Sequence, residues 1–288
     1  MIAFSLVVTA PKGISKCLIS DTLVSEADGA ALELVIADGS EDIVDISRPG
    51  LQHIRLPGRA VFTLRRTGLS HASNDWIVLL EDHCKPMPGL LAAFSNAIRN
   101  YPAVDLFSGA IENKTSTSPW SWANVLYTGH RFFSFSHRRP RTASISNLAI
   151  RRSALCDSEL AHDGGFEVLT LPRLTRSGRY MHCAGAVVDH VQPRTWSKGC
   201  ATHFHNARCH GAFQRALRDK LGRAWLVESV WAFYGITVRP LRIMLDLRAT
   251  EHFKLSTLPK LVLLGLAAGA GRLWGLLTGP GLSAQELD

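Results

Sequence analysis

The chain has 288 residues, of which 46% are hydrophobic and 19% are charged. This balance excludes an intrinsically disordered protein and leaves room for one large domain or two smaller ones. The formal net charge of +8 favours anionic partners such as nucleic acid, an anionic membrane surface or a phosphorylated substrate, without choosing among them.

The first residues and the cysteines indicate a reducing compartment. Met1 to Val8 leads directly into a strand-like segment, without the basic region and small-residue cleavage site of a signal peptide. The six cysteines are scattered and form no CxxC pair, which favours free thiols over disulfides. We therefore expect a cytoplasmic protein.

Two predicted strands open the chain, and the second ends in a potential ligand site. They cover residues 4–9 and 33–37, and the second is followed by Asp38, Gly39 and Ser40. A carboxylate at a strand end, followed by glycine, is suited to contact a ribose or a base, because glycine lets the backbone approach closely. An ordinary turn is the alternative explanation.

An apolar run that ends in polar residues is the most informative stretch. Residues 75–80 are typical of a buried parallel strand, and Glu81, Asp82 and His83 follow it. Open α/β sheets bind ligands at the carboxyl ends of their strands, and alternate side chains of an extended segment point the same way. Glu81 and His83 are therefore expected to hold a divalent cation together. A solvated loop is the alternative.

Strands and helices alternate as far as about residue 191, which predicts an α/β domain. Asp163 and Glu167 lie at the glycine-rich start of a predicted helix that continues to Ser177 and is expected to be broken at Pro172. Either acid is a candidate general base, although acids at a helix N-terminus also complement the helix dipole. The other predicted helices cover 14–26, 58–73 and 89–100, and the other predicted strands cover 51–56, 104–109 and 180–188. An irregular substrate-side loop is expected at 114–141, and it ends in a basic run at 137–141. A compact segment follows at 146–152.

The ordered set of these stretches resembles the family 2 nucleotide-sugar glycosyltransferases of GT-A fold. The set comprises Asp38-Gly39-Ser40, Glu81-Asp82-His83, Pro86-Met87-Pro88-Gly89, Asn147 to Arg152, the acid-led helix with Arg173-Leu174 and Gly178, and the strand ending in His190. The resemblance covers most of residues 1–191. It implies a Rossmann-like, mostly parallel sheet flanked by helices.

The resemblance also implies roles for individual residues. The family's nucleoside-binding acid matches Asp38, although Ala37 stands where the family has a further acid. The family's Asp-x-Asp is similar to Glu81-Asp82-His83, so Glu81 and His83 are the expected metal ligands, and the imidazole shifts the preference from magnesium toward manganese. The acceptor-side base matches Glu167, with Asp163 as second choice. The expected ligands of the nucleotide sugar are Asp38, Arg66, Asp82, Asn147 and Arg151.

The character of the chain changes after residue 195. We predict a glycosyltransferase domain at 1–195 and a helical, membrane-associating tail at 196–288. The apolar run at 261–271 is shorter than the about 20 residues that span a bilayer, and Arg272 follows it. An interfacial segment fits better, and a helical hairpin packed on the domain is the alternative. Cysteines and histidines between 200 and 210 match no common zinc spacing.

The predicted function is transfer of a sugar from a nucleotide-diphosphate donor to an acceptor hydroxyl, by direct displacement assisted by Mn²⁺ or Mg²⁺. The expected acceptor is a lipid-linked or cell-surface glycan precursor, and the expected location is the inner face of the plasma membrane. A GT-A-like binding or scaffold protein without turnover is the first alternative, which Ala37 and His83 keep open. No nucleic-acid-binding module is recognised, so nucleic acid is not an expected partner.

Overall fold

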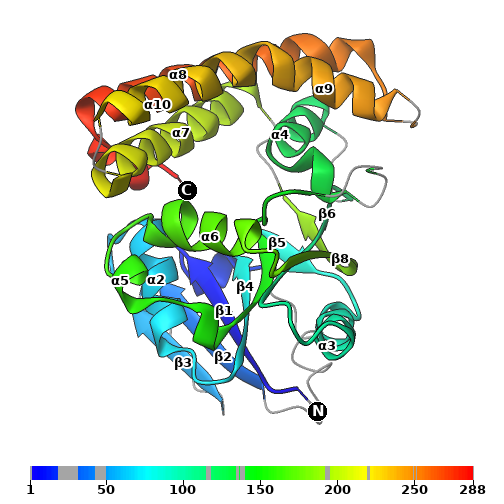
Figure 1. Ribbon diagram of the computed structural model, residues 1–288, viewed down its shortest axis with the longest axis vertical. Coiled ribbons are helices and arrows are strands. Elements are labelled where there is room, and N and C mark those ends of the chain that lie inside the picture. The colour runs from blue at the N-terminus through cyan, green and yellow to red at the C-terminus, as the bar shows by residue number, and fades with distance from the viewer. Residues whose placement is uncertain are drawn as a thin grey trace. The chain divides into compact units, whose positions relative to one another are not determined.

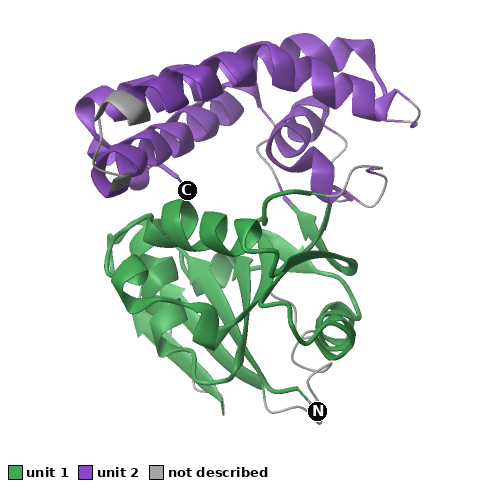
Figure 2. Cartoon of the chain, viewed as in Figure 1, with its two compact units in different colours: residues 1–112, 140–190 green, residues 113–139, 191–288 purple. Residues whose placement is uncertain are grey.

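The computed structural model describes residues 2–18, 32–42, 50–114, 118–133, 136, 140–191, 195–218, 221–248, 250 and 252–287. The chain divides into two compact units, which are residues 1–112 with 140–190 and residues 113–139 with 191–288 (Figure 2). The segment at 113–139 thus groups with the C-terminal helices, whereas the sequence placed it in the first domain. The domain boundary at 195/196 stays a prediction.

Unit 1 is built on one eight-stranded sheet in the order β3-β2-β1-β4-β7-β6-β8-β5 (Figure 1). β1 pairs in parallel with β2 and β4, and β2 with β3. β7 runs antiparallel to both β4 and β6, and β5 runs antiparallel to β8. The strands are β1 Phe4–Ala10, β2 Leu32–Asp38, β3 Leu51–Arg55, β4 Trp76–Glu81, β5 Cys84–Pro86, β6 Leu106–Glu112, β7 Asn147–Arg151 and β8 Tyr180–His190.

The register of the parallel strands sets the position of the site. Ala10 of β1 lies opposite Asp38, and Thr9 lies opposite Glu81. The last residues of β1, β2 and β4 therefore meet at one edge of the sheet, which we call the carboxyl edge. The strands before it are buried apolar runs such as Leu6 to Val8, because helices cover the sheet.

Helices flank the sheet, which confirms the predicted α/β fold class. Helix α2 (Val61–His71) packs on β1 and β2, and α3 (Leu90–Asn100) packs on β8 (Figure 1). A Cβ at Gly68 of α2 would come within 2.6 Å of the Val7 side chain, so the glycine permits close packing of helix on sheet. The remaining helical elements are η1 Ile14–Lys16, η3 Arg152–Ala154, α5 Asp157–Leu160, the π-helix η4 Phe166–Thr170 and α6 Leu171–Arg176.

Unit 2 is helical, as predicted for the tail. Helix α10 packs on both α7 and α8 through glycines. Cβ atoms at Gly271 and Gly275 would collide with the backbone of Phe204 and Arg208 in α7, and one at Gly265 would collide with Gly235 in α8. The elements are α4 Pro119–Gly129, η2 His130–Phe132, α7 Trp196–Arg218, α8 Leu221–Ile236, α9 Val238–Leu247, η5 Leu255–Thr257, α10 Leu258–Thr278 and η6 Gly281–Ala284.

Local structure corrects several expectations. The stretch at 114–141 is not irregular throughout, because Ser118 caps α4 and Pro119 occupies its first turn, where a missing N–H costs nothing. Pro172 likewise lies in the first turn of α6 and does not break it. Of the helix predicted at 14–26, the described part contains only the turn η1, and residues 19–26 lie outside the described residues. Residues 137–139 of the basic run also lie outside them.

Candidate metal and nucleotide-sugar site

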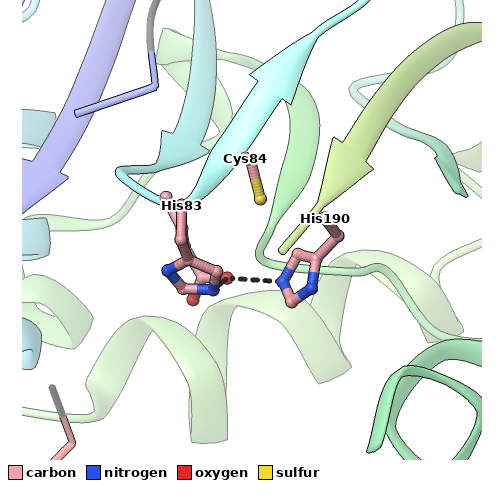
Figure 3. A group of neighbouring side chains, drawn as sticks. His83, Cys84 and His190 are labelled. Atoms are coloured by element: carbon pink, nitrogen blue, oxygen red, sulfur yellow. Dashed lines mark hydrogen bonds and ion pairs between the residues drawn. The ribbon is translucent and has the colours of Figure 1, made fainter. Parts of the chain in front are cut away.

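Four potential metal ligands converge at the carboxyl edge. Glu81 ends β4, His83 lies in the following turn, and Cys84 begins β5. The fourth residue, His190, ends β8 and lies directly opposite Cys84 in the sheet. One ligand atom from each residue lies within 4.8 Å of the other three. Figure 3 shows the two imidazoles side by side, with the Cys84 side chain pointing toward them.

The Glu81 carboxylate is the centre of this group. Its Oε2 lies 3.4 Å from His190 Nε2 and 3.6 Å from His83 Nε2. Ser146 donates a hydrogen bond of 2.6 Å to the same oxygen. Arg65 Nη2 lies 3.3 Å from the other oxygen, Oε1. Two imidazoles, a hydroxyl and a guanidinium thus orient a single carboxylate.

Asp82 orients the imidazole of His83. Its Oδ1 lies 2.9 Å from His83 Nδ1, while Nε2 of the same ring faces Glu81. A histidine that binds a metal through one nitrogen commonly has its other nitrogen held by a carboxylate, which fixes the ring orientation and tautomer. The Asp82–His83 pair has this arrangement, which suits His83 as a ligand through Nε2.

The charges of the group shift the pKa values of its members. Burial would raise the pKa of Glu81, but the His190 hydrogen bond and the charges of His83 and Arg65 hold that pKa well below its usual range. Burial would lower the pKa of His83, and the hydrogen bond to Asp82 with the charge of Glu81 raises it instead. Burial prevails at His190, whose pKa is lowered. Glu81 is therefore an anionic ligand at neutral pH.

Arg65 joins this group to the expected general base. Its side chain is buried, and Nη1 forms an ion pair with Oε1 of Glu167 while Nη2 contacts Glu81. Glu167 lies in the π-helix that precedes α6. One guanidinium therefore holds the carboxylate at the metal site and the expected acceptor-side carboxylate next to each other.

The neighbouring arginine, Arg66, lies in a different environment. It pairs with Asp163 at 3.0 Å, and both side chains are about two-fifths exposed. Thr63 also donates to both oxygens of Asp163. The structure brings Arg65, and not Arg66, to the four-ligand group. No signal in the sequence distinguishes these adjacent residues, because the sequence does not show which face of α2 lies on the sheet.

Asp38 lies at the same edge, at the end of β2. Its Oδ1 accepts hydrogen bonds from the Ser40 backbone N–H and hydroxyl, each 2.8 Å long, and its Oδ2 lies 2.9 Å from His53 Nε2. Burial would raise the pKa of Asp38, but these hydrogen bonds lower it. A Cβ at Gly13, whose φ is 98°, would come within 2.8 Å of the Ser40 hydroxyl. Glycine thus lets the loop after β1 approach the Asp38 turn.

With this geometry established, comparison with known proteins identifies the domain. The model of glycosyl transferase family 2 matches residues 31–156. Residues 31–156 thus resemble a family 2 glycosyltransferase domain. This match bears out the predicted resemblance and, with it, the enzyme class. Glu81 and His83, the two predicted metal ligands, belong with Cys84 and His190 to a group that could hold a metal ion.

Comparison with solved structures supports the GT-A-type fold through the first of the two matches that follow. The mannosyltransferase PcManGT from Pyrobaculum calidifontis, in complex with GDP-Man and Mn²⁺, is 17% identical over 94% of this chain and 87% of its own, with a TM-score of 0.53. Glucosyl-3-phosphoglycerate synthase from Mycobacterium tuberculosis, in complex with Mn²⁺ and UDP-Glc, is 15% identical over 69% of this chain and 74% of its own, with a TM-score of 0.45. Among curated proteins, none matches the chain.

Two of the expected nucleotide-sugar ligands, Asn147 and Arg151, make contacts within unit 1 that support the sheet. Asn147 is buried, and its amide nitrogen donates to the carbonyls of Ala110 and Ala186 at 3.0 and 2.8 Å. These bonds brace β6 and β8 at the register shift after Gly109. A Cβ at Gly109 would collide with the Asn147 amide, so the Asn147 side chain can take this position only because residue 109 is glycine.

Arg151 lies at the opposite end of the sheet from the metal ligands. Because β7 is antiparallel to β4, Asn147 lies opposite Leu80, whereas Arg151 lies opposite Trp76 at the amino end. Its Nε pairs with Asp105 at 2.9 Å, and its guanidinium lies over the Trp76 ring at 4.7 Å. The direction of β7, which the sequence pattern did not reveal, thus places Arg151 away from the four-ligand group.

The sequence did not indicate that Cys84 and His190 join Glu81 and His83 in one group. Cys84 resembles a core thiol in sequence, and the short strand β5 that places it was not predicted. His190 was noted only as the end of a strand. The signal that identifies it is the strand itself, because a histidine at the carboxyl end of β8 reaches the same edge as Glu81.

Proposed function

We propose that the protein transfers a sugar from a nucleotide-diphosphate donor to an acceptor hydroxyl, with a divalent ion at the carboxyl edge. The observation that supports this most strongly is the group of Glu81, His83, Cys84 and His190 next to the Arg65–Glu167 ion pair. Asp38 ends a parallel strand at the same edge. A donor laid along this edge would meet Asp38 first and the metal ligands next.

Asp38 and Asp82 are the proposed donor-side residues. Asp38 is an ionised carboxylate held rigid by Ser40 and His53, which suits a hydrogen bond from a nucleoside N–H or hydroxyl. Asp82 is largely buried and orients His83. Its contribution to donor binding would therefore act mainly through the metal ligand.

The chemistry proposed is direct displacement at the anomeric carbon. A bound divalent ion would neutralise charge on the departing nucleoside diphosphate. Glu167 would accept the proton of the attacking hydroxyl, and Arg65 would hold its carboxylate in place next to Glu81. Asp163 remains the second candidate base, although its exposed pairing with Arg66 is typical of a surface ion pair.

An assay of donor turnover tests this function. Purified protein is incubated with a panel of nucleotide sugars and Mn²⁺, and release of the nucleoside diphosphate is measured by chromatography. We expect release from one donor, with strong loss in Glu167→Gln and little change in the matched variant Asp163→Asn. Full turnover by Glu167→Gln would exclude Glu167 as the base. Nucleotide binding without release from any donor would favour the scaffold alternative.

We also propose that unit 2 holds the enzyme at a membrane surface, where a lipid-linked or cell-surface glycan precursor would be the acceptor. Helix α9 is amphipathic, with Ile243 and Leu247 buried and Leu241 and Leu245 more than half exposed. The exposed large apolar side chains of α8 and α10 are Trp225, Leu226, Val227, Val230, Trp231, Phe233, Leu263, Leu266, Trp274 and Leu277. Exposed apolar residues in such number mark an interaction surface.

Peripheral attachment is favoured over a spanning helix. In the described part of the chain, one helix, Leu255–Thr278, is long and apolar enough to cross a membrane, a criterion that core helices of soluble proteins also meet. Its glycines pack against α7 and α8. Insertion across a bilayer would give up this packing, whereas interfacial binding through the exposed side chains keeps it.

Sedimentation with vesicles tests the attachment. We expect the protein to bind vesicles that contain anionic lipid, and a Leu241→Glu/Leu245→Glu variant to remain in solution. The matched variant Arg248→Glu, at an exposed polar position that ends the same helix, should bind only slightly less. Equal recovery of all three proteins in the supernatant would contradict the attachment.

A further inference from the structure

The ligand set at the carboxyl edge is unusual for a site that serves magnesium. Mg²⁺ prefers six oxygen ligands in octahedral geometry. The group here offers one carboxylate, two imidazoles and one thiol, from Glu81, His83, His190 and Cys84. Imidazole and thiolate are ligands of zinc and of neighbouring transition metals.

The distances fit one small ion bound by all four residues. Bonds of about 2.0–2.3 Å at tetrahedral angles place neighbouring ligand atoms roughly 3.3–3.7 Å apart. The separations from Glu81 Oε2 to His190 Nε2 and to His83 Nε2 are 3.4 and 3.6 Å. Every pair of ligand atoms in the group, including those with the Cys84 sulfur, lies within 4.8 Å.

The backbone gives this group a fixed geometry. Glu81, His83 and Cys84 belong to a single strand–turn–strand segment, and Cys84 pairs with His190 across the sheet. Cys84 is fully buried, so its sulfur faces the group and not bulk water. Asp82 holds His83 with Nε2 directed at Glu81. Ligands held in this way need little reorganisation to bind an ion.

We propose that Cys84 binds the divalent ion as a thiolate together with Glu81, His83 and His190, and that the site binds zinc and cobalt more tightly than manganese and magnesium. On binding, the S–H bond of Cys84 breaks, the sulfur keeps the electron pair and donates it to the ion, and the proton passes to solvent. No oxidation occurs. The inference deepens the metal role in the proposed function, but it concerns ion binding alone and does not require sugar transfer.

Titration with Co²⁺ tests the thiolate directly. Metal-free protein is titrated with cobalt, and the near-ultraviolet spectrum is recorded for thiolate-to-cobalt charge transfer. We expect the band in the wild type, its loss in Cys84→Ser, and its retention in the matched variant Cys183→Ser, because Cys183 lies on β8 outside the group and contacts the Ala93 carbonyl. A wild-type spectrum without the band, or an unchanged band in a folded Cys84→Ser protein, would overturn the proposal.

Competition against a chromophoric chelator gives an independent measurement that does not depend on how well Cys84→Ser folds. For the wild type we expect affinity to fall in the order Zn²⁺, Co²⁺, Mn²⁺, Mg²⁺. Asp82→Asn should weaken zinc binding about 10–100-fold, because it removes the carboxylate that orients His83. Magnesium binding as tightly as zinc would overturn the proposal. Donor turnover measured on the same protein would then show whether the proposed sugar transfer holds even if the zinc preference does not.

Discussion

Each end of the β4–β7 strand pair lies beside an acid that pairs with an arginine, yet the two ends differ in what surrounds the acid. At the carboxyl end, Glu81 lies 3.3 Å from Arg65. At the amino end, Asp105 lies 2.9 Å from Arg151 and also pairs with Arg179. Both acids sit beside a strand terminus, and both pairs tie distant segments together.

The difference lies in the remaining ligands. The described partners of the Asp105 side chain are guanidinium groups, and Arg151 in turn packs on Trp76. Around Glu81, two imidazoles and a hydroxyl approach the carboxylate in addition to Arg65, and a thiol lies next to it. A buried acid–arginine pair by itself is therefore structural. An excess of metal-binding side chains around one carboxylate is what distinguishes the candidate site.

The largest effect that separates the two ends is expected from removing each acid. Glu81→Gln should lower donor turnover at least about 100-fold, because it removes a central ligand of the proposed ion. Asp105→Asn should leave turnover per folded molecule unchanged while it lowers the free energy of unfolding by about 1–3 kcal/mol. Steady-state turnover and urea denaturation measure the two quantities. Similar turnover losses in both variants would contradict the functional difference between Glu81 and Asp105.

The adjacent arginines of α2 give the next largest contrast. Arg65→Gln leaves Glu81 and Glu167 without their shared guanidinium, and we expect a loss of about 3–5 kcal/mol in the free energy of unfolding. Arg66→Gln removes only an exposed pair with Asp163, which is worth about 0–1 kcal/mol. Chemical denaturation of both variants measures the two changes in the free energy of unfolding. Equal changes would contradict the role of Arg65 as a buried link between Glu81 and Glu167.

A smaller effect is expected at Asp38 as the pH falls. The pKa of this carboxyl is lowered in the folded protein from its ordinary value of 3.8. Its stabilising contribution is therefore present above pH 3.8 and is lost as the pH falls below that value toward the folded-state pKa. Urea unfolding at pH 7 and in this acidic range should show a smaller pH-induced loss for Asp38→Asn than for the wild type. If the wild type and Asp38→Asn lost the same amount of unfolding free energy on acidification, folding would not lower the pKa of Asp38.

The smallest effect is expected when Arg151→Gln is tested for its affinity for a nucleoside diphosphate. Since Arg151 lies at the amino end of β4, its removal should leave nucleoside diphosphate affinity unchanged, although stability falls. Calorimetric titration of a nucleoside diphosphate into the variant checks this. A clear loss of affinity would return Arg151 to the donor site, as the sequence first indicated.

These contrasts show what the sequence determines at this site. Apolar runs such as Ile77 to Leu80 predict buried strands, and the residues after such a run are predicted to lie at the edge of the sheet, which is where the structure places Asp38, Glu81 and His83. Strand direction and helix phase depend on tertiary packing. The sequence therefore did not separate Arg65 from Arg66, and it did not show that β7 carries Arg151 away from the site. Cys84 and His190 meet only through the pairing of β5 with β8.

In the proposed function, the carboxyl-edge group binds a divalent ion on which donor binding depends. A thermal-shift panel of nucleoside diphosphates, each with and without Mn²⁺, tests it most directly. We predict that one nucleotide raises the melting temperature of the wild type only when metal is present, and that chelator or a Glu81→Ala/His83→Ala substitution abolishes the rise. A nucleotide that stabilises the wild type and this variant equally, with or without metal, would contradict the claim.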